Sequence, residues 1–477
     1  MKRAYLPTIF LIVLALLYVL LSDFSFTPVV FLSILLLIIL ASKNELFREQ
    51  LIYSWEWRTI DGIIIGALSL LYIVIGVYNL PDFPHRRHHF ISFFLFPSEK
   101  IWFSGLLAII AVSFMIVLFV HFLQGEKKQI GEAFNEEKAL KILTTYGGNS
   151  DSQLIFLKDK RMFAYEKDGE PTVLLQFACF NNKCIVMGDP SGKKEDFPEA
   201  IEAFIEETDR LCYLPVFYET SEEIVMILHE FGYDFIKMGE EAYVDLNSFT
   251  TSGKKMKGTR AVLNRIEREG FTFDVLQPPF STEQMSTFKN ISDNWLGSRK
   301  EKGFSLGFFS EDYLQRAPIA VVKNTQEEIV AFATIMPTYT NNKVGTIDLM
   351  RYDPKKAPSG SMDFLFLHLF AYMKEEHIQW FNLGMAPLSN VGTSRKSFLQ
   401  ERIAYLVYEF GSHFYSFHGL REYKSKYATN WVSRYTLYSR DSWIAYVMIA
   451  LLIIDNAPVE QTQGRISGLK KWIRRKY

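Results

Sequence analysis

Asp348 and Arg351 are the residues whose types and positions point most directly to chemistry. They belong to Val344–Pro354, an apolar stretch that predicts a buried strand ending in two opposite charges. A helix is predicted over Asp363–His377 and a second strand over Ile378–Leu383, which ends at a glycine turn. This βαβ order places ligands at the carboxyl ends of its strands. We therefore expect a site there, and the alternative is an ion pair that only closes the strand.

Three motifs in this half of the chain occur in a consistent order. They are Asp348-Leu-Met-Arg351, Gly384-Met-Ala-Pro-Leu388, and Lys424-Ser-Lys426-Tyr427 followed by Trp431 and Arg434. Together they resemble the phosphatidylglycerol lysyltransferase (multiple peptide resistance factor) family, specifically its cytosolic aminoacyl-transfer domain. The likeness covers roughly residues 130–440, and several motifs in register are more specific than any one of them.

The resemblance implies transfer of an aminoacyl group from a tRNA ester to a lipid hydroxyl. Such a reaction needs a group that holds the donor ammonium, a group that stabilises the tetrahedral oxyanion and a proton acceptor. Asp348 and Arg351 are assigned to the aminoacyl site, and Lys424 and Lys426 to catalysis or phosphate binding; which lysine is essential stays open. The substrate-binding residues expected from the resemblance are Glu301, Gly384, Met385, Trp431 and Arg434.

Glu301 stands in Glu301–Gly307, which with Trp295 resembles the family's central motif. It is expected to help select a basic side chain, and a helix-end carboxylate is the alternative. His368 and His377 flank a helix with no third ligand at metal spacing, so packing or surface roles are expected and no metal site.

No cofactor is expected. The acetyl-CoA signature is a glycine-rich turn that cradles pyrophosphate at a helix N-terminus. Pro358-Ser-Gly-Ser361 occupies that place and is poor in glycine. A bulkier donor such as aminoacyl-tRNA fits better, and lysine is the family's commonest donor, although the sequence does not name the amino acid.

The polar part of the chain predicts an α/β fold built as tandem N-acetyltransferase-like (GNAT/Fem-like) domains, 132–250 and 251–440. The order is strands, helix, strand, helix and strand, and it occurs twice. In the first domain the strands are expected at Leu154–Leu157, Met162–Glu166, Thr172–Phe180, Lys183–Met187, Pro215–Glu219 and Glu241–Leu246, with helices at Glu136–Tyr146, Phe197–Leu211 and Ser221–Phe231. In the second they are expected at Ile319–Lys323, Glu328–Thr334, Val344–Leu349 and Trp380–Leu383, with Leu399–Phe410 near the end.

Residues 1–125 predict a transmembrane region of about four helices. The apolar runs are Leu6–Leu21, Pro28–Ala41, Ile60–Leu80 and Ile101–Leu123, and the last two are long enough to cross a bilayer of about 30 Å. No small-residue cleavage site follows the first run, which argues against a signal peptide. Basic residues favour one side of the membrane and predict cytosolic termini. This chain lacks room for the additional spans of the longer family members, so synthesis without a dedicated translocase is expected.

The net charge is −1, so binding to a polyanion must rely on local patches. One is the predicted helix that carries Lys257, Arg260, Arg265 and Arg268, where phosphate binding competes with a solvated face. Another is residues 441–477, an amphipathic basic segment that suits an anionic leaflet or forms a disordered tail. Cys179, Cys184 and Cys212 lack CxxC spacing and are expected to be reduced core thiols.

The expected function is lysyl transfer from aminoacyl-tRNA to phosphatidylglycerol at the inner leaflet by a multi-pass protein of the cell membrane. It would lower the negative charge of the membrane and give resistance to cationic antimicrobial peptides. The alternatives are a Fem-type ligase acting on a peptidoglycan precursor and a non-catalytic lipid-binding protein. The expected partners are aminoacyl-tRNA, phosphatidylglycerol and the membrane, and a homo-oligomer is left open.

Overall fold

The computed structural model describes residues 2–22, 25–43, 48–78, 99–124, 127–254, 256–341, 343–410, 417–440 and 442–457. These residues form two compact units, 1–130 with 206–213, and 131–205 with 214–477. Residues 79–98, and residues 458–477 of the predicted basic C-terminal segment, lie outside the described residues.

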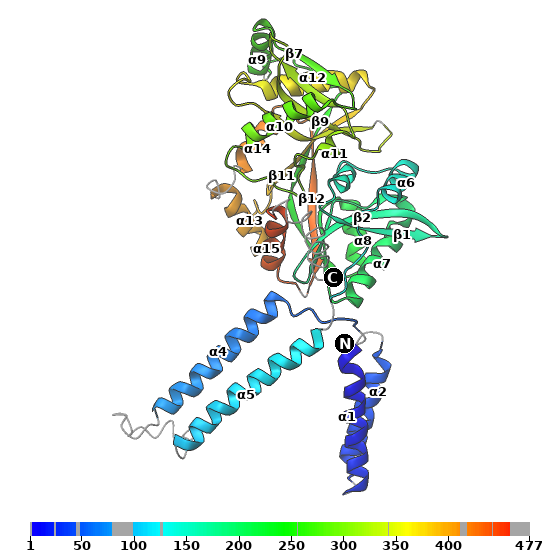
Figure 1. The fold of residues 1–477 in the computed structure, drawn as a ribbon, viewed down its shortest axis with the longest axis vertical. Helices are drawn as coiled ribbons and strands as arrows, with labels where there is room; N and C mark the ends of the chain where they lie inside the picture. The colour runs from blue at the N-terminus through cyan, green and yellow to red at the C-terminus, as the bar shows by residue number, and fades with distance from the viewer. Residues whose placement is uncertain are drawn as a thin grey trace, which may run out of the picture. The chain divides into compact units, whose positions relative to one another are not determined.

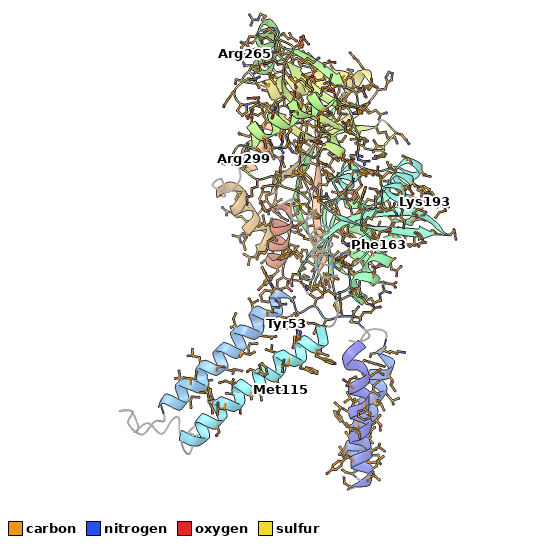
Figure 2. All side chains as sticks on the ribbon, viewed as in Figure 1. Tyr53, Met115, Phe163, Lys193, Arg265 and Arg299 are labelled. Carbon is orange, nitrogen blue, oxygen red and sulfur yellow. The ribbon has the colours of Figure 1, made fainter. Side chains whose placement is uncertain are left out.

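The first unit contains the four predicted apolar helices, α1 (Lys2–Leu21), α2 (Phe26–Ala41), α4 (Trp55–Tyr78) and α5 (Glu99–Gln124). Two stretches are long and apolar enough to cross a membrane, Trp55–Gly76 and Ser104–Gln124, whereas α1 and α2 are shorter. Apolar side chains on α5 are exposed, among them Met115, which is 64% exposed and is labelled in Figure 2. Apolar side chains without protein cover fit a lipid environment.

The second unit is built on one mixed sheet with helices on both faces (Figure 1). Its first half contains α6 (Glu136–Tyr146), a 3₁₀ helix (Ser152–Leu157), β1 (Arg161–Lys167), β2 (Glu170–Phe180), β3 (Lys183–Met187), β4 (Ser191–Gly192), a short 3₁₀ turn (Lys194–Asp196), the greater part of α7 (Phe197–Arg210), β5 (Leu214–Thr220), α8 (Glu222–Glu230) and β6 (Tyr233–Asp245).

The second half repeats this order with additions. Its elements are α9 (Lys257–Arg268), β7 (Thr272–Leu276), α10 (Thr282–Leu296), α11 (Glu311–Leu314), β8 (Ile319–Lys323), β9 (Ile329–Met336), β10 (Val344–Tyr352), α12 (Ser361–Glu375), β11 (Trp380–Pro387), α13 (Leu399–Phe410), α14 (Phe417–Ser425), β12 (Asn430–Ser439) and α15 (Ile444–Asp455).

The two halves exchange their last strands. The sheet order is β1-β2-β3-β5-β12-β6-β11-β10-β9-β8-β7, with β4 paired to β2. Thus β12, from the second half, lies between β5 and β6 of the first half, and β6 pairs with β11 of the second half. The predicted tandem α/β architecture is confirmed, but the sheet runs without a break across the predicted boundary at 250/251.

Helices cover the sheet with two apolar cores. One core lies under α6, α10 and α15 and includes Phe156, Phe288 and Phe332. The other lies under α9 and α12 and includes Ile266, Phe364 and Phe381. Burial of these large side chains is the main favourable contribution to folding of such a sheet.

Three predictions about local structure were wrong or incomplete: one strand, the C-terminal segment and the burial of one cysteine. Leu154–Leu157 is a 3₁₀ helix rather than a strand, because periodicity does not distinguish a four-residue apolar run. The segment 441–477 begins with a core helix, since α15 buries Val447, Ala450, Leu451 and Ile454. Cys179 is exposed rather than in the core, with its Sγ 3.0 Å from that of Cys184 on the paired strand.

Candidate active site

Three strands of the sheet, β10, β11 and β5, depart from regular register. Parallel pairing of β10 with β11 ends at Thr346 and Asn382, although both strands continue. Extra residues then interrupt the pairing of β10 with β9, between Ile347 and Met350, and of β11 with β6, between Asn382 and Met385. A further irregularity lies in β5 opposite β12. Bulges re-aim side chains and are common beside active sites.

Asp348 lies in the β10 bulge and is held by two donors. The Gly307 N–H donates to Oδ1 at 2.8 Å, and the Tyr313 hydroxyl donates to Oδ2 at 3.1 Å. Gly307 is required for this approach, because a Cβ there would lie 1.7 Å from Oδ2. Burial raises the pKa of Asp348, although these two hydrogen bonds and the nearby Lys160 and Arg351 oppose that rise.

Arg351 is almost buried beside Asp348. Its Nη2 lies 2.8 Å from Oε2 of Glu301, and its guanidinium stacks 3.9 Å from the Trp295 ring centroid. Its side chain is 7% exposed, and burial lowers its pKa even though Glu301 and Asp348 favour the charged form. The structure thus brings Glu301, which the sequence suggested as a substrate-binding residue, into an ion pair with Arg351 close to Asp348. Their roles remain a prediction.

A second group of charges is centred on Glu241 of β6. Arg434 of β12 donates through Nε to Oε2 at 2.7 Å, Tyr243 donates to the same oxygen at 3.0 Å, and Asn382 donates to Oε1 at 2.5 Å. Nη1 of Arg434 also lies 3.7 Å from Asp189. Burial lowers the pKa of Arg434, but Glu241, Tyr243 and Asp189 outweigh this effect and raise it.

Two further carboxylates, Asp151 and Glu219, extend this group. Burial and the charge of Glu241 raise the pKa of Asp151 to about 7. Burial, followed by Asp151 and Glu241, raises the pKa of Glu219 well above its usual value. Glu219 has φ of 64° inside β5, a strained backbone of the kind that is often found at functional sites. We call Asp151, Asp189, Glu219, Glu241, Arg434 and Lys424 the acidic cluster.

The two candidate lysines lie in different environments. Lys424 of α14 donates to the Met385 carbonyl at 2.8 Å, and burial lowers its pKa to about 8 against the opposing charges of Glu219 and Glu241. Lys426 is exposed, and its Nζ lies 3.6 Å from Asp363 of α12.

Lys426 and Asp348 lie on opposite faces of the sheet. Tyr313, which binds Asp348, belongs to the core under α10, whereas α12 and Tyr427 belong to the other core. No contact between Lys426 and Asp348 occurs among the described residues. The sequence also suggests that Lys426 joins Asp348 and Arg351 in one site, and the structure does not bring Lys426 to them. Strand order alone does not say which face of the sheet the turn between α14 and β12 occupies.

Of the remaining predicted substrate-binding residues, Gly384 and Met385 lie beside the acidic cluster and Trp431 does not. Gly384, with φ of 79°, forms the β11 bulge and donates to Asn382 Oδ1 at 2.7 Å. Its neighbour Met385 positions Lys424. Trp431 instead stacks under Arg421 at 4.4 Å, and Arg421 is paired with Glu240. The Arg421 contact of Trp431 therefore lies outside the acidic cluster.

The basic helix α9 buries only Ile266 and presents its arginines outward, as Figure 2 shows for Arg265. Several guanidiniums already bind backbone carbonyls. Arg260 donates to Gly253 at 2.8 Å, Arg268 donates to Asn264 at 3.0 Å, and Arg265 donates to the Ser359 carbonyl. These bonds use few of the donors that a guanidinium offers. The structure is compatible with both predicted roles of this helix, phosphate binding and a solvated face.

His368 packs against rings, as predicted. It stacks on Phe273 with 5.3 Å between centroids and also contacts Phe364.

The sequence prediction missed Asp151, Asp189, Glu219 and Glu241 as site residues. Each lies in or beside a predicted strand or turn of the first half, where single carboxylates are usually solvated. Only the insertion of β12 between β5 and β6 brings them to Arg434. The usable signal was that Asp189 follows a predicted strand and that Glu219 is the last residue of another.

Comparison with known families decides the relationship. A family model described as phosphatidylglycerol lysyltransferase, C-terminal, matches residues 140–438. The chain belongs to the phosphatidylglycerol lysyltransferase family. It is 40% identical over 451 residues to a phosphatidylglycerol lysyltransferase of Bacillus subtilis strain 168, covering 94% of this chain and 51% of that protein. A phosphatidylglycerol lysyltransferase of Staphylococcus aureus strain COL is 37% identical over 390 residues, covering 81% and 45%.

A solved structure of this lysyltransferase family is also similar. The structure of L-PGS from Bacillus licheniformis is 48% identical, with a TM-score of 0.61, and the match covers 69% of this chain and 99% of that one. The chain spans about half the length of the lysyltransferase relatives from Bacillus subtilis and Staphylococcus aureus. The family is thus established, and the activity of this chain is argued below.

Proposed function

We propose that this protein transfers a lysyl group from lysyl-tRNA to a glycerol hydroxyl of phosphatidylglycerol. The observation that carries the proposal is the charge imbalance of the acidic cluster, in which four carboxylates surround Arg434 and Lys424. Burial is the main cause of the raised pKa values of Asp151, Asp189 and Glu219, and neighbouring carboxylates add to it, so a cation bound among these groups would favour their ionised forms. A lysyl ester supplies two ammonium groups and so fits the cluster better than a neutral aminoacyl group.

Lys424 is the best-placed group to move the proton. Its lowered pKa makes a neutral amine available near pH 8, as general base catalysis requires. Nζ would accept the proton of the lipid hydroxyl as that oxygen attacks the ester carbonyl carbon. The bond from this carbon to the tRNA ribose oxygen then breaks, and the ribose oxygen receives the proton from Nζ. Asp348 would hold an ammonium of the lysyl group.

Arg351 and Glu301 would position Asp348 rather than touch the lipid phosphate. Arg351 is nearly buried and is already paired, so its charge supports the ionised form of Asp348. This differs from the direct phosphate or oxyanion contact expected from the sequence.

The N-terminus of α12 is covered by α9 in a way that fits an acyl donor other than coenzyme A. A Cβ on Gly360, which caps α12, would lie 2.4 Å from a Val262 side-chain carbon. Arg265 binds the adjacent Ser359 carbonyl. Aminoacyl-tRNA as donor, with α9 as one of its phosphate contacts, is part of the proposal.

The location of each part of the protein in the cell follows from where the two substrates are found. Charged tRNA is cytosolic and the lipid lies in the membrane, so we place the second unit in the cytosol and α4 and α5, with α1 and α2, in the membrane as a multi-pass anchor. Adding a lysyl group would lower the negative charge of the leaflet and favour resistance to cationic peptides.

Lipid analysis of cells tests the proposal. A host without aminoacylated lipids would express the full chain, and its lipid extract would be separated by thin-layer chromatography. A new ninhydrin-positive derivative of phosphatidylglycerol that releases lysine on mild alkaline hydrolysis is expected. No such lipid, or lysine appearing in a peptidoglycan precursor instead, would contradict the proposal and favour the Fem-type alternative.

A further inference from the structure

The segment Arg395–Ile403 exposes apolar side chains to an unusual degree. Phe398 is 78%, Leu399 is 68% and Ile403 is 52% exposed. Among the described residues of the second unit, Phe398 is the most exposed large apolar side chain. The three lie in the turn before α13 and in its first turns, where a soluble protein gains nothing by exposing them.

Basic side chains are interleaved with these apolar ones. Arg395, Lys396 and Arg402 are exposed, and Glu401 is the acidic residue of the segment. Exposed aromatic and aliphatic groups among lysine and arginine are typical of surfaces that enter the interface of an anionic bilayer.

In the sequence, the segment lies between two elements that contribute to the active site, β11 and α14. On the N-terminal side, β11 carries Met385, whose carbonyl binds Lys424. The intervening turn is fixed, because Val391 is 1% exposed and Asn390 donates to Glu240 at 2.8 Å. On the C-terminal side the chain continues into α14, which carries Lys424.

We infer that Arg395–Ile403 is a membrane-docking segment that seats the second unit on an anionic bilayer, with Phe398, Leu399 and Ile403 inserted among the acyl chains. The occupant is a lipid bilayer because the apolar and basic groups match both of its layers and because α4 and α5 are fit to anchor the chain in one. The inference rests on the proposed function only for its purpose, which is to bring phosphatidylglycerol to Lys424.

Photo-crosslinking of the full chain tests the contact directly. A benzoylphenylalanine would replace Phe398 in protein reconstituted into phosphatidylcholine–phosphatidylglycerol vesicles that carry alkyne-tagged acyl chains. Met226, which is 69% exposed on α8, provides a matched control position. We expect lipid adducts at 398 at least about fivefold above those at 226. Equal adducts at both positions, or adducts at 398 only with a second protein molecule, would overturn the inference.

A kinetic comparison separates docking from chemistry. The variant Phe398→Ser/Leu399→Ser/Ile403→Ser should raise the KM for phosphatidylglycerol in vesicles about tenfold or more, because three apolar side chains no longer enter the bilayer. Its rate with monomeric dihexanoyl phosphatidylglycerol should stay at that of the unsubstituted chain. An equal loss with both substrates, or no loss with vesicles, would refute docking. If the unsubstituted chain transfers to neither lipid, the proposed function fails and the crosslinks still decide the docking.

Discussion

Asp348 owes its position to one irregularity in a strand. The β10 bulge turns its carboxylate toward the Gly307 N–H and the Tyr313 hydroxyl. Replacing Asp348 by Asn keeps the shape and removes the charge. We expect the variant to melt normally and to lose ten- to a hundredfold in kcat/KM, because a charge-assisted hydrogen bond contributes about 1.5–3 kcal/mol. Unchanged transfer by a normally folded variant would remove Asp348 from the site.

Gly307 offers a second test of the same contact. In Gly307→Ala the new Cβ would overlap Asp348, since it would lie 1.7 Å from Oδ2. The carboxylate must shift, so kcat/KM should fall at least about tenfold while far-ultraviolet circular dichroism is retained. Gly66→Ala in α4 provides a control, because a Cβ on Gly66 would meet no atom within 4 Å. An equal effect of both substitutions would contradict the role given to Gly307.

Asp151 makes stability depend on pH in a definite direction. Its pKa is raised by burial to about 7, whereas the unfolded chain has a value near 4. The folded state therefore binds a proton that the unfolded state releases, and stability falls as the pH rises from about 4 through 7.

Asp151→Asn removes this dependence. The difference in Tm, variant minus unsubstituted chain, should increase between pH 5 and pH 8 in thermal melts. Asp168→Asn, in the exposed turn between β1 and β2, is the control and should show no such increase. A difference that stays constant or shrinks with pH would show that Asp151 ionises freely in the folded protein.

At the scale of elements, charge reversal on α9 distinguishes a phosphate-binding surface from a face that is only solvated. Reversing Arg260, Arg265 and Arg268 to Glu should weaken tRNA binding and flatten its dependence on salt. Each phosphate contact contributes about −0.7 to −0.9 to the slope of log K against log salt. The control reverses Lys141, Lys193 and Lys194 on the first half. If the slope is the same for both triple variants, α9 is a solvated face.

The elements also show how far the sequence alone could reach. The βαβ order placed Asp348, Arg351 and Gly384 near one another, since local pattern and strand order determine that edge. It did not reveal that Arg434 lies against Glu241, because their strands belong to different halves and pair only through the exchange of β6 and β12. It also could not show that Lys424 is bound to the Met385 carbonyl whereas Lys426 is exposed beside Asp363, because the two lysines stand two residues apart in similar sequence surroundings.

At the scale of the whole molecule, the anchor makes a topological prediction. Basic residues at Lys2, Arg3, Lys43, Arg48, Arg58, Lys127 and Lys128 fall on one side if α1, α2, α4 and α5 all cross the membrane. A reporter fused after Tyr477 should be active only if it works in the cytoplasm. Activity of a reporter that works only outside the cytoplasm would refute the four-span arrangement and the placement of the active site.

The account as a whole depends on lysyl transfer at the acidic cluster through Lys424. The most direct measurement uses purified full chain, [14C]lysyl-tRNA and phosphatidylglycerol vesicles, with Lys424→Met compared to Lys426→Met. The unsubstituted chain should form labelled lipid. Lys424→Met should lower kcat about a hundredfold or more, as expected for loss of a general base, and Lys426→Met should retain most of the rate. Labelled lipid that forms at full rate with Lys424→Met, or that never forms with the unsubstituted chain, would contradict the central claim.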